Sequence, residues 1–269
     1  MIDKRWVGKS FSRAAAGYDR VAALQRHAGE GLLERLPGGV FSPRTILDLG
    51  AGTGYCTALL GNRFPAANLI ALDLAEGMLS TIKQRQGLPE KVMRICGDAE
   101  TLPLREASVD LVFSNLALQW CTDLSAVMGE LYRVLRPGGL LLFSTFGEAT
   151  LWELREAWAK ADHYTHVNTF VAKLAVETAL AKANFANISV HSEHCGIAYS
   201  SVHALLCELK NLGAHNVTMN RPRHLTGKGV LRKMLEAYAA AMPPGRIEAS
   251  FEVIYGQARL PAVGCEGGA

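Results

Sequence analysis

The sequence predicts an α/β protein with a mostly parallel seven-stranded sheet, helices on both faces of that sheet, and a helical insert before the last strand. Short apolar runs alternate with helical segments between residues 45 and 143, which is the pattern of a parallel sheet covered by helices. A glycine-rich loop follows the first apolar run. With 269 residues, 49% of them hydrophobic and 20% charged, the chain has the composition of a packed globular domain.

The elements of the first half follow in order. Residues 3–36 are expected to form two helical pieces, which the turn Pro37-Gly38-Gly39 ends. We expect strands at 45–49, 69–72, 92–96, 109–113 and 140–143, with helices at 55–64, 76–86 and 125–135. Pro137-Gly138-Gly139 is predicted as a tight turn between the last of these helices and the last of these strands.

The second half is mostly helical. We expect helices at 151–160, 170–183 and 202–212, and a further helix that Thr226 caps and that runs to about residue 241. Alternating segments at 188–199 and 247–260 are predicted strands. We therefore expect one domain over residues 1–269, with an N-terminal helical segment (1–36), a core that carries the glycine loop (40–146) and a helical insert (200–243).

The composition and the amino terminus indicate the expected location of the protein and argue against several kinds of site. The amino terminus is charged and lacks the apolar core of a signal peptide, and no run reaches the ~18 apolar residues of a membrane span, so we expect a cytoplasmic protein without membrane contact. The six cysteines contain no CxxC pair and no regular spacing, which predicts neither a metal site nor a disulfide framework.

Charge is concentrated in one segment of the chain. The net charge is +3, but residues 209–235 contain six basic and no acidic side chains, so the rest of the chain carries −3. This overall charge is too small to indicate nucleic-acid binding. The basic segment lies inside the predicted helical insert and is the natural place to bind an anion.

The glycine loop Asp48-Leu49-Gly50-Ala51-Gly52-Thr53-Gly54 lies between a predicted strand and a predicted helix, which is the context that makes it informative. Glycine lets a ligand approach the backbone and permits positive φ. Asp48, two residues before the first of these glycines, disfavours a pyrophosphate and suits a cationic amino group. A dinucleotide-binding GxGxxG pattern would need glycine at position 55, where the chain has Tyr55.

Two more aspartates end the next strands. Asp73 follows the second strand, where a carboxylate can accept hydrogen bonds from both ribose hydroxyls, and Asp98 follows the third, where it can meet an adenine amino group. The alternative is that each aspartate only caps the helix behind it. Three carboxylates at neighbouring strand ends predict one crevice for a cationic nucleoside.

The first ~145 residues resemble class I S-adenosylmethionine (SAM) methyltransferases, in the glycine loop, Ala71-Leu72-Asp73, Gly97-Asp98 and the segment Glu130 to Gly139. The resemblance implies a Rossmann-like class I methyltransferase fold with SAM as cofactor. Further motifs look like the malonyl-acyl-carrier-protein O-methyltransferases of biotin synthesis (BioC type): Phe11 to Tyr18, Leu24-Gln25, Ser114 to Trp120, and Leu209 to Ala214.

That resemblance implies methylation of the free carboxylate of malonyl-acyl-carrier protein, with the insert as a lid over the acyl group. The expected cofactor site comprises Tyr18, Gln25, Asp48, Gly50, Ala51, Gly52, Gly54, Asp73, Leu74, Met78, Asp98, Ala99, Ser114 and Leu116. The residues expected to position the reacting groups are Tyr18, Ser114, Asn115 and Gln119. No catalytic His or Cys is expected, because the carboxylate is already ionised at neutral pH.

The basic residues are expected to hold the substrate. Lys210, Arg221 and Arg223 are predicted to bind the acyl carboxylate, since guanidinium groups match carboxylates. With Lys4, Arg5, Lys9 and Arg13 they could also steer an acidic carrier protein, although any one of them could equally be a solvated side chain.

Two other functions stay open at this point. One is a methyltransferase that acts on a quinone precursor or a free carboxylic acid, which would need no basic insert. The other is a methyltransferase-like assembly factor for a respiratory complex, since such proteins share the Phe-Ser-Arg-Ala-Ala start. A nucleic-acid methyltransferase lacks support, because the chain has no Asn-Pro-Pro-Tyr-type motif.

Overall fold

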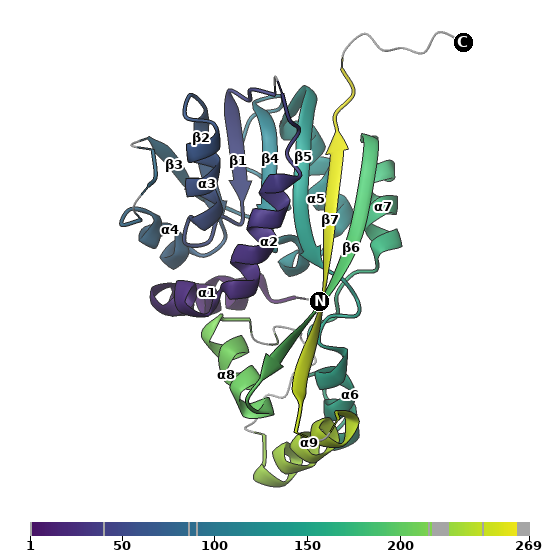
Figure 1. The fold of residues 1–269 in the computed structure, drawn as a ribbon. Coiled ribbons are helices and arrows are strands. Elements are labelled where there is room, and N and C mark those ends of the chain that lie inside the picture. Colours follow the sequence, from purple (N-terminus) through teal and green to yellow (C-terminus); the bar gives the residue numbers. More distant parts are fainter. Residues whose placement is uncertain are drawn as a thin grey trace, which may run out of the picture.

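A computed structural model describes residues 2–39, 41–85, 87–89, 91–214, 216, 226–243 and 245–262. Its sheet has seven strands in the order β3-β2-β1-β4-β5-β7-β6 (Figure 1). The strands are β1 (Thr45–Leu49), β2 (Asn68–Asp73), β3 (Val92–Cys96), β4 (Val109–Asn115), β5 (Leu135–Phe146), β6 (Ala186–Tyr199) and β7 (Ile247–Arg259). β7 runs antiparallel to β5 and β6, and the pairs among β1 to β5 are parallel. The predicted fold class is thus confirmed.

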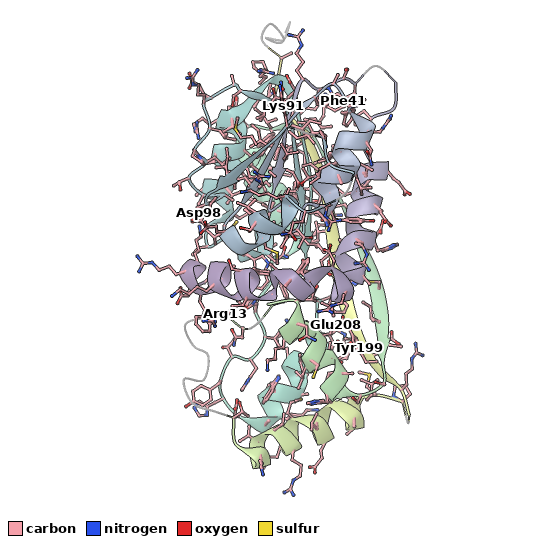
Figure 2. All side chains as sticks on the ribbon, turned by 90° about the vertical axis from the view of Figure 1, so that its left-hand side faces the viewer. Arg13, Phe41, Lys91, Asp98, Tyr199 and Glu208 are labelled. Carbon is pink, nitrogen blue, oxygen red and sulfur yellow. The ribbon has the colours of Figure 1, made fainter. Side chains whose placement is uncertain are left out.

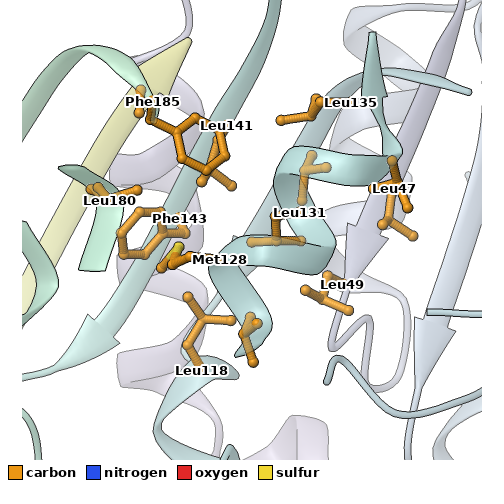
Figure 3. Close-up of a cluster of buried hydrophobic side chains, with 14 of the residues drawn as sticks. Leu47, Leu49, Leu118, Met128, Leu131, Leu135, Leu141, Phe143, Leu180 and Phe185 are labelled. Carbon is orange, nitrogen blue, oxygen red and sulfur yellow. The ribbon is translucent and has the colours of Figure 1, made fainter. Parts of the chain in front are cut away.

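Helices cover both faces of the sheet. α2 (Ala23–Glu34) and α3 (Tyr55–Arg63) bury Leu32 and Leu60 on one face, against Ile46 of β1 and Leu142 of β5. α5 (Leu124–Val134) and α7 (Lys173–Lys182) cover the other face, where Met128, Leu131 and Leu180 surround Phe143 (Figure 3). Alternate strand residues therefore point into two different cores, which is why the central strands are apolar at nearly every position.

The first helix lies across the carboxyl ends of the parallel strands. α1 (Lys4–Val21) is capped by the Asp3 side chain and packs on α4 (Glu76–Ile82) (Figure 1). At their contact Ser12 Oγ accepts a hydrogen bond from Gly77 N at 3.1 Å, and a Cβ at Gly77 would lie 2.7 Å from Ser12 Cα. Only glycine allows this close approach, so α1 is held against the strand ends.

A second core lies beyond the carboxyl edge of the sheet. α6 (Trp152–Ala161), α8 (Val202–Asn211) and α9 (Lys228–Ala241) pack with the extended ends of β6 and β7 (Figure 1). Leu154, Leu205, Met234, Tyr238 and Phe251 are buried there. We call these three helices and two strand ends the lid. α8 and α9 belong to the expected insert, and α6, which precedes it in the chain, shares its core.

Three local expectations are wrong. Pro137-Gly138-Gly139 belongs to β5 instead of forming a separate turn, because Gly138 N donates to Leu260 O and Leu260 N donates to Gly139 O, both at 3.0 Å. α9 begins at Lys228 with Gly227 as N-cap and without a side-chain cap, so Thr226 does not cap it. α4 ends at Ile82, not at residue 86.

The strand-to-helix link after β4 contains a short 3-10 helix, η1 (Leu118–Trp120), that the sequence did not suggest. Within the described residues, no helix combines the length and the hydropathy that crossing a bilayer requires.

Candidate active site

The glycine loop leaves β1 in a conformation that only glycine accepts easily. Gly50 has φ of +75° and its amide donates to Leu72 O at 2.8 Å. A Cβ at Gly50 would lie 2.2 Å from Ala117 Cβ. The loop therefore holds the ends of β1, β2 and β4 together and presents its backbone to a cleft between them.

Asp73 lies at the end of β2 beside this loop. Its two carboxylate oxygens accept hydrogen bonds from Gly52 N and Ala75 N, each at 2.8 Å. Burial raises the pKa of Asp73, although these amides oppose the rise. Since the two carboxylate oxygens have about four acceptor positions together, Asp73 can still accept a hydrogen bond from a ligand in the cleft that it lines.

Asp48 lies deeper in the site. Its side chain is only 2% exposed, and Thr57 donates a hydrogen bond to it at 2.6 Å. Burial, followed by the charge of nearby Asp73, raises the pKa of Asp48 to about 7, although the Thr57 hydrogen bond opposes this rise. A cation bound nearby would restore the ionised form.

Asp98 lines the cleft and forms an ion pair with Lys4. Lys4 of α1 donates to both of its carboxylate oxygens at 2.7 Å and also contacts Glu100 Oε2 at 2.7 Å. Lys4 lines the cleft with Asp98, and the expectation that it also helps to steer a carrier protein stays a prediction. The contact joins residues 94 positions apart and fastens α1 over the end of β3.

The segment after β4 forms the opposite wall. Leu116 has a left-handed φ of +47°, and its amide donates to Ser144 O and Ser144 Oγ at 3.1 and 3.0 Å. Ser114 Oγ donates to Leu49 O at 2.9 Å, and Gln119 Nε2 donates to Leu116 O at 2.5 Å. These two side chains hold the turn and line neither the cleft nor the cavity described below.

Asn115 and Leu116 themselves line the cleft. Asn115 Nδ2 donates to the backbone oxygen of Gln25 at 2.8 Å, and Asn115 Oδ1 accepts from Ser144 Oγ at 2.8 Å. The turn therefore positions α2 as well as the wall of the cleft, because the Asn115 side chain holds the backbone of Gln25, which lies on α2.

The cleft has two compartments. The outer one has a volume of about 740 Å³, part of it open to solvent, and is lined by Leu74, Met78 and Ala99 together with Asp73, Asp98 and Leu116. The inner one is lined by Gln25, Asp48, Ala51 and Cys56. Tyr18, Gly50, Gly52 and Asn115 line both compartments. Gly54, with φ of +84°, is the N-cap of α3 behind the loop.

Tyr18 lies at the junction of the two compartments. Burial, then the charges of Asp73, Cys56 and Asp19, raises the pKa of its phenol far above the usual range. The hydroxyl is therefore a hydrogen-bond donor at neutral pH. Phe11 packs edge-on against Tyr18 and Trp120, with ring centroids 6.4 and 5.1 Å apart.

A larger cavity of about 1020 Å³ lies between the cleft and the lid. We call it the lid cavity. Its walls are mainly apolar, with Phe146, Leu154 and Trp158 among them, and Lys210 lies at its rim. Trp120 lines both this cavity and the outer compartment, and Gln25 lines both this cavity and the inner one. Gln25 Oε1 is buried without a hydrogen-bond partner among the described residues.

Of the three predicted substrate cations, only Lys210 can be placed, because Arg221 and Arg223 lie outside the described residues. Sequence reasoning did not single out Phe11, or the contacts that tie α1 to the glycine loop. There Thr53 Oγ1 donates to Asp19 at 2.6 Å and Arg85 Nε donates to Thr53 O at 2.8 Å, while Arg85 also pairs with Asp19. Within the described part of the chain, no cluster of His, Cys, Asp and Glu could hold a metal ion.

Known proteins match both the sequence and the fold. A family model described as "Methyltransferase domain" matches residues 47–143. A malonyl-[acyl-carrier protein] O-methyltransferase of Methylococcus capsulatus is 50% identical over 255 residues, which cover 94% of this chain and 92% of that protein. The corresponding enzyme of Gallionella capsiferriformans is 42% identical over 268 residues, 97% of this chain and 92% of that protein.

The chain belongs to the malonyl-[acyl-carrier protein] O-methyltransferase family.

Other relatives of this family fit the same picture. The chain also matches, at 42% identity over 94% of its length, half of a biotin biosynthesis bifunctional protein BioHC of Cellvibrio japonicus. Among solved structures, a methyltransferase of Bacillus halodurans has a TM-score of 0.63 at 19% identity and covers 88% of this chain and 100% of its own. A phosphoethanolamine N-methyltransferase of Haemonchus contortus, solved with SAM, has a TM-score of 0.56 at 17% identity and covers 93% of this chain and 57% of its own. These two structures confirm the methyltransferase fold.

Proposed function

We propose that this enzyme transfers a methyl group from SAM to the free carboxylate of a malonyl group carried by an acyl carrier protein, and its relatives are named malonyl-[acyl-carrier protein] O-methyltransferases. The observation that carries the proposal is that the cleft and the lid cavity share the walls Trp120 and Gln25. A cofactor in the cleft and an acyl group in the cavity would therefore meet at one place.

The residues of the cleft fit SAM. Asp73 lines the cleft with a carboxylate that can accept hydrogen bonds from the ribose, and the glycine loop presents backbone without side chains. Leu74, Met78 and Ala99 offer apolar contacts for the adenine, and buried Asp48 would face the cationic end of the methionine part. When bound, SAM supplies an electrophilic methyl group on a sulfonium centre.

The chain itself needs to provide little acid–base chemistry. A carboxylate nucleophile with a pKa of about 4 is ionised at neutral pH, so no general base is needed. Cys121 and Cys56 lie in the cleft walls, but burial raises the pKa of Cys121 to about 12 and raises that of Cys56 well above its usual range. Both therefore stay thiols and are poor nucleophiles.

The remaining task is to align the carboxylate and to remove water from it, effects that contribute several kcal/mol when the geometry is fixed. Tyr18 can donate a hydrogen bond at the junction of the compartments, and Gln25 places an amide between cleft and cavity. We propose that Ser114 and Gln119 act as positioning residues, because they hold the turn that carries Asn115 and Leu116.

The direct test supplies methyl-labelled SAM with either malonyl- or acetyl-carrier protein. The expected result is a labelled, base-labile ester on the malonyl form alone, since only that form has a free carboxylate. Label on the acetyl form, or on neither protein, would overturn the proposed function.

A further inference from the structure

The proposed reaction does not use a groove on the side of α1 that faces the lid. It runs between α1 and the end of α8, and its lining includes Trp6, Ser10, Arg13, Arg20, Lys210 and Asn211. Arg13 lies on the lid side of α1, whereas Asp98 lies on the sheet side (Figure 2). The groove is therefore separate from the cofactor cleft, although the same helix forms a wall of each.

The groove is basic. Arg13 and Arg20 are seven positions apart on α1, which places them on the same face of the helix two turns apart. Lys210 adds a third cation from α8, and the described lining contains no carboxylate. None of the three cations forms an ion pair within the described chain, whereas Lys4, which lines the cleft, is paired with Asp98 and Glu100. Three unpaired cations around one hollow favour an anionic ligand.

The groove has fixed walls. Ser10 Oγ donates to Gly213 O at 2.9 Å, so the end of α8 is fastened to α1. Gly213 has φ of +74°, and a Cβ there would lie 3.1 Å from Ser10 O, so the chain passes close to α1 at this point. The Arg13 guanidinium lies over the Trp6 ring, 5.8 Å from its centroid. These contacts set the spacing between the arginines of α1 and Lys210.

The groove also adjoins the lid cavity. Lys210 lines both of them, so this cation lies where the groove meets the space in which the acyl group is proposed to react. A carrier protein holds its acyl thioester on a long pantetheine arm that ends in a phosphodiester. When the acyl end lies in the lid cavity, this phosphodiester must remain outside, on the side of the carrier protein.

We propose that the groove of Arg13, Arg20 and Lys210 binds the phosphodiester of the pantetheine arm and so docks the carrier protein beside the lid cavity. This inference rests on the proposed function, and it names the surface by which the enzyme takes the protein-bound form of its substrate. Guanidinium groups bind phosphate oxygens through paired, charge-assisted hydrogen bonds, which suits two arginines on one helix face.

The test compares the double variant Arg13→Glu/Arg20→Glu with the wild type on two substrates. One is malonyl-carrier protein, and the other is the malonyl thioester of N-acetylcysteamine, which keeps the reacting end and has no phosphate. The matched control is Lys83→Glu/Arg94→Glu, which makes the same change in charge at exposed positions, at the C-cap of α4 and on β3, outside the groove.

We expect the groove variant to raise KM for malonyl-carrier protein by about tenfold or more, and to change kcat/KM for the small thioester by less than about twofold. The control should match the wild type on both. In a binding experiment, the wild type should prefer holo- over apo-carrier protein, which lacks the arm, and the groove variant should lose this preference.

Equal losses on both substrates, or an unchanged KM for malonyl-carrier protein, would overturn the docking inference while leaving the proposed function intact. A wild-type enzyme that methylates neither substrate would overturn both.

Discussion

The buried environment of Asp48 alters the charge that its side chain carries. It is buried and its pKa is raised to about 7, so at neutral pH the free enzyme holds it partly protonated. The cationic end of SAM would favour the carboxylate and lower this pKa on binding. Below pH 7 the binding of the cofactor must therefore release a proton, and the affinity must fall as the pH falls.

We predict that Kd for SAM rises by about tenfold for each pH unit below 7, until the lowered pKa of the bound state is reached. Calorimetry in two buffers of different ionisation enthalpy would measure the proton release directly. Asp48→Asn keeps an acceptor for Thr57 and should bind more weakly with a flatter pH profile. An unchanged profile in this variant would assign the proton to another group, such as Asp73.

Tyr18 gives a second prediction at this scale. Because its phenol stays protonated, its role in our account is to donate a hydrogen bond, and Tyr18→Phe removes only that. Turnover with saturating SAM should fall by about ten- to a hundredfold, the effect of losing a hydrogen bond to a charged group. Tyr132→Phe, on α5 against Phe185, is the matched control. Equal rates for the two variants would remove Tyr18 from the reaction.

α1 joins the cofactor cleft to the lid, and Lys4 fastens its first turn to Asp98 and Glu100. Removing Lys4 would leave two carboxylates close together without a cation, which favours opening of the helix end. For Lys4→Ala we predict faster amide hydrogen exchange over residues 4–12 and a Kd for SAM raised about three- to tenfold.

Lys9→Ala is the control for this prediction, because Lys9 is exposed on the same helix and forms no ion pair among the described residues. If exchange in α1 were the same in both variants, the Lys4 contact would not hold the helix.

The elements that sequence reasoning predicts well are those with a strong local signal. The five strands from β1 to β5 are short apolar runs bounded by turn residues, and the glycine loop is one of these boundaries. Such runs can be recognised without knowing which strands pair with one another. The error at Pro137-Gly138-Gly139 occurs where a residue distant in the sequence determines the local structure. Leu260 pairs with Gly138 and Gly139 and so extends β5 through a segment that resembles a turn.

At the scale of the whole molecule, the proposed function places the cofactor in the cleft and the acyl group in the lid cavity. Leu209 lines only the cavity. We predict that Leu209→Trp, which fills part of this space, lowers turnover of malonyl-carrier protein by about tenfold or more and leaves Kd for SAM within about twofold. Leu174→Trp, on the exposed face of α7, is the control. A parallel loss of SAM binding would show that the two spaces are not independent.

As with the fold, only part of the candidate site can be predicted from the sequence. Asp48, Asp73 and Asp98 lie at or just beyond the carboxyl ends of β1, β2 and β3, which are neighbours in the sheet, so their proximity follows from the fold alone. That Lys4 reaches Asp98, and that α6 joins the lid, depends on contacts between segments far apart in the chain. Ser114 and Gln119 carry no local sign that their side chains are committed to backbone oxygens.

The most direct test of this division is a crystal structure of the enzyme with S-adenosylhomocysteine and a non-reactive malonyl thioester analogue. The account predicts that the ribose hydroxyls contact Asp73 and that the malonyl carboxylate lies between Trp120 and Gln25, in line with the sulfur. A malonyl group bound elsewhere, with its carboxylate pointing away from the sulfur, would contradict it.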